Sequence, residues 1–285
     1  IGDLYENSVE RLRLGHKAHG REERVAAKKQ AVAEMLGDKA YLVEKLDDRF
    51  ADTYWIAETE DVIAINLPHY EAATKAEHAL SIHAQFYEAL GATLVTVIAD
   101  DHPGLFFRIA GAINLAGGNI IDARIHTSRD GWAVDNFLVQ DPHGRPFMEE
   151  GQLDRLKKSI ADALANRIDL EPRLAQRPLP HSRSKAFDVD PRIVFDNKAS
   201  NRFTVIEVNA RDRSALLNRL SRSLFEEGLV VHSAHVTAYG ERAVDTFYVT
   251  DVTGSKITGE ARLARIEGSL LVAASDALQA QLEDA

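Results

Sequence analysis

Apolar residues recur along the chain with two different periods, and the periods predict where strands and helices lie. The run LVTVIA from Leu94 is continuously apolar, as in a buried strand. After it, apolar residues return every three or four positions, which indicates one face of a helix, and Gly117 and Gly118 end the pattern. The helical positions are Leu105, Ile109, Ala112, Ile113 and Ala116.

The same reading predicts the neighbouring elements. Alternation of apolar and polar residues over 80–86 indicates a half-buried strand, although a helix remains possible there. Further strands are predicted at 94–99, 120–127 and 133–140, with a turn at 129–131, and an amphipathic helix at 149–168.

This pattern occurs twice. The run from Leu94 returns from Val205 as VIEVNARDRSALLNRLSRSLFEEGLV, so that Asp101 matches Asp212 at an offset of 111. The run VDNFLVQDPHG from Val134 returns as VDTFYVTDVTG from Val244, at an offset of 110. Two copies of a unit of about 90 residues are too few and too long for a solenoid, so they predict two tandem small domains.

The predicted boundaries follow from these periods and from proline content. Residues 1–78 have helical periodicity, 79–170 form the first unit, and 192–285 form the second. Residues 171–191 hold four of the eight prolines and show no periodicity, so they are predicted to be a linker. In the second unit, strands are predicted at 193–196, 203–209, 230–238 and 243–251, and helices at 214–228 and 260–282.

The order of elements predicts the fold class. The second unit ends on a helix, so its fourth strand must come from upstream, and the same logic assigns 80–86 to the first unit. Each unit is therefore expected to be ββαββα, an antiparallel sheet with two helices on one face. The fold class is α+β: tandem, permuted ferredoxin-like sandwiches after an N-terminal helical segment.

Composition narrows the range of functions. A formal charge of −10 argues against binding to nucleic acid, because that affinity comes mainly from Lys and Arg. The chain has no cysteine, no apolar run of membrane-spanning length and a polar start, which together suit a cytoplasmic protein without a membrane partner. It opens without Met and within a helical pattern, which suggests a fragment of a longer chain.

Common catalytic motifs are missing from the sequence. There is no Walker loop, GxGxxG, HExxH or GxSxG, so no catalytic residue is predicted. No metal site is predicted either, because His78 and His83 lack carboxylate partners at ligand spacing, and Asp188 and Asp190 lie in the proline-rich linker.

The turn from Asp101 to Phe106 is the best candidate binding site. It places backbone amides of a helix start beside a carboxylate, which suits a zwitterion: amides bind its carboxylate and an acidic side chain binds its ammonium. Gly104 allows close approach, and Asn119 and Asp122 on the following strand add polar groups. Taken alone, the residues favour a simpler interpretation, in which Asp101 caps the helix and Gly104 relieves crowding.

The run DDHPGLFFRIAGAINLAGGNIIDARI resembles the signature of ACT domains, small ferredoxin-like modules that bind amino acids, usually between paired modules. With the second copy and the upstream DTYWIAETE, the chain resembles the C-terminal region of the bifunctional uridylyltransferase/uridylyl-removing enzymes of nitrogen regulation. The likeness is close over both repeats and loose over 1–78.

The resemblance implies a regulatory role. In that family the enzyme adds uridylyl groups to the PII signal protein and removes them, and tandem ACT modules sense glutamine. The resemblance places the catalytic domains, which require Mg²⁺, upstream, and implies no cofactor in this segment. Two alternatives remain open: a dimerisation module that binds no ligand, with pairing within or between chains, and an ACT regulator of an enzyme that responds to another amino acid.

Carried over residue by residue, the resemblance implies a set of ligand-binding residues. The second turn departs from the family pattern because Ser214 and Ala215 replace Pro and Gly, and Val230 and Ser233 replace Asn and Asp. The first turn is therefore expected to carry the stronger glutamine contacts. The predicted residues are Asp101, His102, Gly104, Leu105, Asn119, Ile120 and Asp122 in the first module and Asp212, Arg213, Ala215 and Leu216 in the second.

Overall fold

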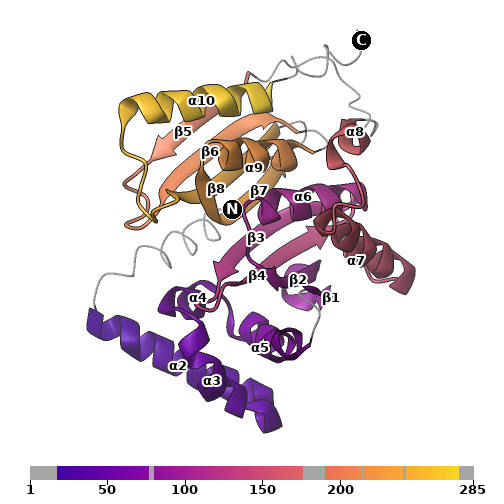
Figure 1. Ribbon diagram of the computed structural model, residues 1–285, viewed down its shortest axis with the longest axis vertical. Coiled ribbons are helices and arrows are strands. Elements are labelled where there is room, and N and C mark those ends of the chain that lie inside the picture. Colours follow the sequence, from indigo (N-terminus) through magenta and orange to yellow (C-terminus); the bar gives the residue numbers. More distant parts are fainter. Residues whose placement is uncertain (1–17, 77–79, 176–189, 213–214, 240–241, 276–285) are drawn as a thin grey trace.

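One eight-stranded antiparallel sheet runs through both repeated units. The computed structural model describes residues 18–76, 80–175, 190–212, 215–239 and 242–275. Its strands lie in the order β1-β2-β4-β3-β7-β8-β6-β5, so the first four belong to the first unit and the last four to the second (Figure 1). The bounds are β1 Leu80–Tyr87, β2 Ala92–Asp100, β3 Asn119–Thr127, β4 Trp132–Gln140, β5 Arg192–Asp196, β6 Thr204–Arg211, β7 Leu229–Tyr239 and β8 Arg242–Asp251.

The helices form two separate layers. One face of the sheet carries α6 (Leu105–Leu115), α7 (Glu150–Leu164), α9 (Leu216–Glu226) and α10 (Glu260–Ala274). The opposite face of the first unit packs against the N-terminal helices α2 (Ala18–Leu36), α3 (Tyr41–Leu46), α4 (Asp52–Ala57) and α5 (Glu60–Lys75), which are called the helical segment below. The predicted α+β class, the ββαββα units and the helical character of residues 18–76 are thus confirmed, while residues 1–17 lie outside the described residues. No described helix has both the length and the apolar character needed to cross a bilayer.

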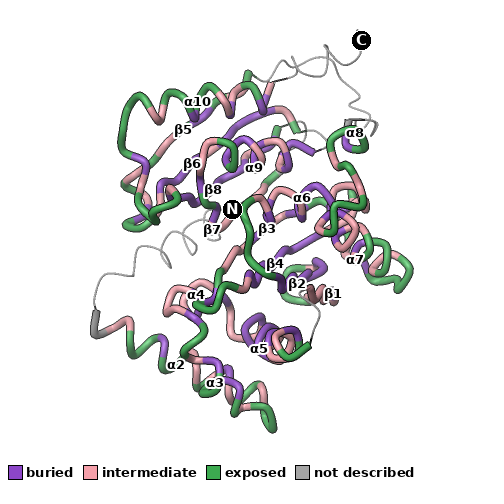
Figure 2. The backbone as a smooth tube through the Cα atoms, in the orientation of Figure 1, coloured by how far each residue is buried: buried purple, intermediate pink, exposed green. Residues whose placement is uncertain are grey.

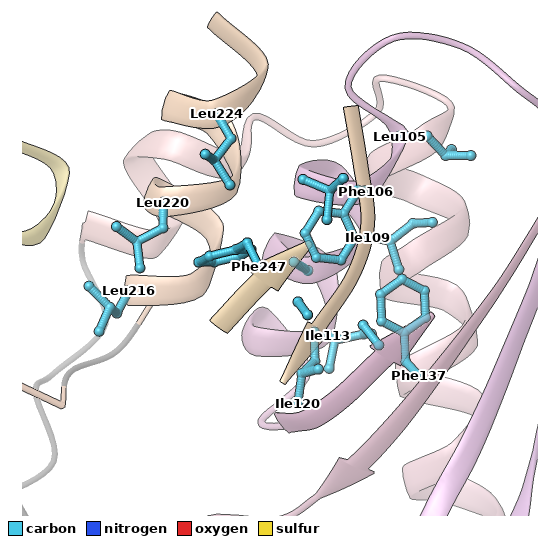
Figure 3. Close-up of a cluster of buried hydrophobic side chains, with 14 of the residues drawn as sticks. Leu105, Phe106, Ile109, Ile113, Ile120, Phe137, Leu216, Leu220, Leu224 and Phe247 are labelled. Atoms are coloured by element: carbon cyan, nitrogen blue, oxygen red, sulfur yellow. The ribbon is translucent and has the colours of Figure 1, made fainter. Parts of the chain in front are cut away.

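Strand alternation divides the apolar side chains between the two faces. In β4, Phe137 faces α6 and joins one core that extends through both units (Figure 3). Val134 lies on the other face of the strand and packs against the helical segment. Tyr54 and Trp55 anchor the helical segment and are 2% and 0% exposed. Full burial of side chains this large stabilises the packing by about 2–3 kcal/mol each. Figure 2 shows the resulting concentration of buried residues along β2 and β4.

Several element ends differ from the predicted ones. Helix α7 stops at Leu164 instead of residue 168 because Asn166 adopts a left-handed φ of 54°, and the Arg167 amide donates to Asp162 O at 2.8 Å, as in a Schellman motif. The predicted linker opens with a short helix, α8 (Leu170–Ala175), which is too brief to show a periodicity in the sequence. Residues 176–189, and the predicted end of the last helix at 276–282, lie outside the described residues.

The two units join edge to edge within the chain, a choice that the sequence left open. Strands β3 and β7 pair at three positions, Asp122 with His235, Ala123 with Ala234 and Arg124 with Ser233. The central residues Ala123 and Ala234 are equivalent in the repeat and both fully buried, so the junction has a local two-fold axis. Helices α6 and α9 also meet there, and Asn218 Nδ2 donates to Phe107 O at 2.6 Å.

Candidate functional site

A cavity of about 1000 Å³ lies where the two units separate beyond their short junction. The β3–β7 ladder stops at Arg124, although β3 continues to Thr127 and β7 already begins at Leu229. The residues of these unpaired ends line the cavity, together with the first turn at 101–107 and part of the helical segment at 51–59. The cavity therefore contacts all three parts of the chain.

The first turn is shaped by Gly104 and Thr127. Gly104 has φ 85°, and a Cβ there would lie 2.6 Å from a ring carbon of Phe107, so glycine is required. The carboxylate of Asp101 accepts a hydrogen bond from Thr127 Oγ1 at 2.6 Å, and the helix N-cap is Gly104 without a side-chain hydrogen bond. The interpretation that Asp101 caps the helix is thus wrong, because Thr127 holds its carboxylate at the cavity.

Backbone amides of the helix start complete this side of the cavity. The Leu105 amide donates to His102 O at 3.2 Å and is therefore occupied. Among the described residues, no group accepts a hydrogen bond from the backbone amides of Phe106 and Phe107, which lie at the N-terminal end of α6. Free amides at a helix N-terminus are suited to an anionic group such as a carboxylate.

A buried acid, Asp135, lies in the cavity wall beneath this turn. It is 0% exposed, and neither of its carboxyl oxygens has a hydrogen-bond partner among the described residues. Burial, and then the charge of Asp101, raise the pKa of Asp135 well above its usual value. The backbone amide of His126 opposes this rise but does not reach hydrogen-bond geometry. A buried polar group without a partner is costly, so Asp135 is poised to bind a donor.

Sequence reasoning missed Asp135, although its signal was in the repeat. The fragments VDNF and VDTF place Asp135 and Asp245 at equivalent positions of β4 and β8, among apolar residues. Asp245 is 1% exposed, and burial, with the nearby charge of Asp212, raises its pKa to about 8. An acid at an inward strand position, repeated in both units, was the signal that could have identified the pair.

Side chains from both units make the rest of the cavity wall aromatic and basic. Phe107 and Phe225, one from each unit, lie with ring centroids 5.5 Å apart. The Phe203 and His232 rings are tilted by 33° with centroids 4.7 Å apart, and the Arg202 guanidinium lies 5.5 Å from the Phe203 ring. Burial, followed by the positive charges of Arg202 and His126, lowers the pKa of His232 to about 4, so its ring is neutral at pH 7.

The structure separates the predicted site residues. Asp101, His102, Gly104 and Leu105 line the cavity. Asn119 and Ile120 do not, because they begin β3 and the cavity lies at its other end. Asp122 is in the β3–β7 ladder, forms an ion pair with Arg124 and contacts the His235 ring.

The second turn also lies away from this cavity. Asp212 is close enough to Asp245 to raise its pKa, and Ala215 and Leu216 are 8% and 4% exposed. Arg213 lies outside the described residues. Within the described ranges, no three His, Asp or Glu side chains converge as metal ligands would.

Ala215 carries backbone strain that its counterpart Gly104 avoids. Its φ is 62°, in the left-handed region, which costs a residue with a Cβ about 1–2 kcal/mol. We expect Ala215→Gly to stabilise the chain by about 1 kcal/mol, measured by urea unfolding, because glycine adopts this φ without a penalty. The matched exchange Gly104→Ala should destabilise it, and a stabilising Gly104→Ala would contradict this account of the two turns.

Comparison with known families adds to this geometry. The family model for the ACT domain matches residues 93–146, which include the first turn, α6, β3 and β4. This part of the chain is an ACT domain. The crystal structure of a protein assigned provisionally as a glycine cleavage system transcriptional repressor aligns with 63% of this ACT-bearing chain and 90% of its own at 14% identity, but the TM-score of 0.21 supports no argument.

Curated relatives match the ACT-bearing chain over nearly all of its length. A bifunctional uridylyltransferase/uridylyl-removing enzyme of Erythrobacter litoralis is 65% identical over 100% of the chain, and one of Novosphingobium aromaticivorans is 62% identical over 97%. A third, from Zymomonas mobilis, is 44% identical over 97%. The chain spans only 31%, 30% and 30% of these relatives. The resemblance to one region of this enzyme family is thereby confirmed.

Proposed function

We propose that this chain is the glutamine-sensing regulatory region of an enzyme that uridylylates and deuridylylates the PII signal protein. The observation that carries the sensing role is the buried, unpartnered Asp135 in a cavity that also holds the carboxylate of Asp101 and the free amides of α6. Acidic side chains and helix-start amides in one cavity suit the opposite charges of an amino acid.

The proposed binding mode assigns a role to each side of the cavity. The ligand ammonium lies at Asp101 and Asp135, and its carboxylate at the amides of Phe106 and Phe107. The polar side chain extends toward Arg202 and His232, where a carboxamide finds both donors and acceptors. Phe107 and Phe225 exclude water from one side, which strengthens the ionic contacts.

The enzymatic part of the proposal rests on the relatives, which are named as uridylyltransferase/uridylyl-removing enzymes. In this proposal the catalytic domains, with their Mg²⁺, belong to the remainder of the enzyme, and the PII protein is its substrate. Glutamine shifts the balance from uridylyl transfer toward removal by binding one of two conformations more tightly than the other.

Titration calorimetry of the chain with glutamine tests the sensing role. We expect saturable binding at micromolar to millimolar ligand, and Asp101→Ala should weaken it about tenfold through loss of an ion pair to the ligand. The variant loses the hydrogen bond that Thr127 Oγ1 donates to Asp101 but no helix cap, so its free energy of unfolding should fall by no more than about 1 kcal/mol.

The same titration distinguishes the alternatives. No heat and no thermal shift at millimolar glutamine would favour a dimerisation module that binds no ligand. Tighter binding of serine, phenylalanine or a branched-chain amino acid would favour an ACT regulator of another enzyme. Unchanged affinity in Asp101→Ala would remove Asp101 from the site.

A further inference from the structure

Glu58 links the helical segment to the first unit, because its carboxylate is hydrogen-bonded to side chains of β3 and β4 beside the cavity. It follows α4 and is 1% exposed, and its carboxylate accepts hydrogen bonds from Arg124 at 3.2 Å, His126 at 2.9 Å and Asn136 at 2.8 Å. Burial alone would raise the pKa of Glu58, but Arg124, His126 and Asn136 bring it to about 2. Glu58 therefore stays ionised, and it depends on donors from strands β3 and β4.

The same arginine continues the contact toward the second unit. Arg124 Nε lies 3.4 Å from one carboxylate oxygen of Asp122, and the other oxygen lies 2.5 Å from His235 Nδ1. Arg124 also donates to Ala57 O at 2.6 Å. Four side chains, Glu58, Arg124, Asp122 and His235, thus form one continuous series of polar contacts, called the relay below, from the helical segment through β3 to β7.

The relay lies beside the cavity and at the junction of the two units, where a bound ligand would change the contacts between β3 and β7. Arg124 and His235 line the cavity, and Asp122, Arg124 and His235 are all members of the three-pair β3–β7 ladder. Within the described chain, no other strand pairs join the two units. A ligand held between the separated ends of β3 and β7 therefore fixes the position of β7 relative to β3. The relay passes from one strand to the other at this same junction, between Asp122 and His235.

We propose that the Glu58–Arg124–Asp122–His235 relay transmits occupancy of the cavity to the helical segment. This inference rests on the proposed function, because it requires a ligand in the cavity. A bound ligand draws the ends of β3 and β7 together, His235 and Asp122 hold Arg124 in place, and Arg124 holds Glu58. The N-terminal helices, which precede both repeated units in the sequence, are thereby held more firmly against the first unit and open less often.

Helix α5 provides a suitable readout because none of its residues lines the cavity. Direct contact with the ligand cannot protect it, so any protection must pass through other residues. We expect saturating glutamine to slow amide hydrogen exchange in α5 of the full chain by at least about fivefold, the lower end of common coupling between two sites. The Glu58→Gln variant should bind glutamine with a Kd within about threefold of the wild type, since Glu58 does not line the cavity, yet lose this slowing.

The matched control is Glu71→Gln. Glu71 is another carboxylate of the helical segment, but its ion pairs with Lys45 and Lys75 stay inside that segment, so the slowing should persist. If Glu58→Gln fails to fold, Asp122→Asn interrupts the relay at a second point and should also lose the slowing.

The outcomes separate the two proposals. Glutamine binding by calorimetry without slower exchange in α5 overturns the relay and leaves the proposed function standing. If glutamine still slows exchange in Glu58→Gln or in Asp122→Asn, the relay is also overturned. Glu58 then only holds the helical segment in place. Absence of glutamine binding by the wild type overturns both.

Discussion

Replacing Asp135 with asparagine is expected to weaken glutamine binding about 30-fold or more. A hydrogen bond between two ionised groups in a water-poor site contributes about 2 kcal/mol or more, which corresponds to that factor. Asparagine keeps the shape of the side chain but not the charge, so the loss reports the interaction with the ammonium. Calorimetry of the two proteins at the same pH measures it.

The raised pKa of Asp135 adds a pH dependence to the same experiment. An ammonium beside the carboxyl favours its ionised form, so binding releases a proton and affinity should rise with pH above the ordinary pKa of an aspartate. In Asp135→Asn this rise should be lost. Asp245→Asn, the equivalent change in the second unit and outside the cavity, is the control. Equal affinities of Asp135→Asn and the wild type would remove Asp135 from the site.

The second large effect is on stability, at Asp245. Its pKa is raised to about 8 by burial and by Asp212, whereas in the unfolded chain it has the ordinary value near 4. The folded state therefore binds more protons, and its stability falls as pH rises from about 4 to about 8. At pH 7 this difference in pKa between the folded and unfolded chain lowers the free energy of unfolding, a cost on the order of 4 kcal/mol.

We expect Asp245→Asn to remove this cost. Urea unfolding at pH 5 and at pH 8 should show that the variant is stabilised far more at pH 8, with the difference growing through that window. Asp141→Asn is a suitable comparison, because the pKa of Asp141 is lowered by hydrogen bonds from Arg145 and its pH dependence has the opposite sign. A variant advantage that is the same at both pH values would contradict the buried-acid account.

The fold could be predicted because the repeat supplied each element twice. The period of Leu105, Ile109 and Ile113 marked α6, and its copy marked α9. Helix ends were harder, because Asn166 and Ala215 adopt left-handed conformations that no periodicity reveals. The continuous sheet could not be predicted, since its junction rests on three backbone pairs centred on two alanines.

The site was predicted in part for a similar reason. The first turn has a local signal in Asp101 and Gly104, and both line the cavity. The other walls come from residues more than one hundred positions away, such as Phe225 and His232, which only the pairing of the units brings near. Asp135 reads in sequence as one acid within an apolar strand, and its missing partner becomes evident only in three dimensions.

Fusion of the two units in one chain has an evolutionary consequence. In an assembly of identical modules, every substitution appears on both sides of the symmetry axis, so the two turns must change together. Here Gly104 and Ala215 occupy equivalent positions and have already diverged. A covalently joined pair can thus keep one half under selection for ligand recognition while the other accumulates changes that serve packing alone.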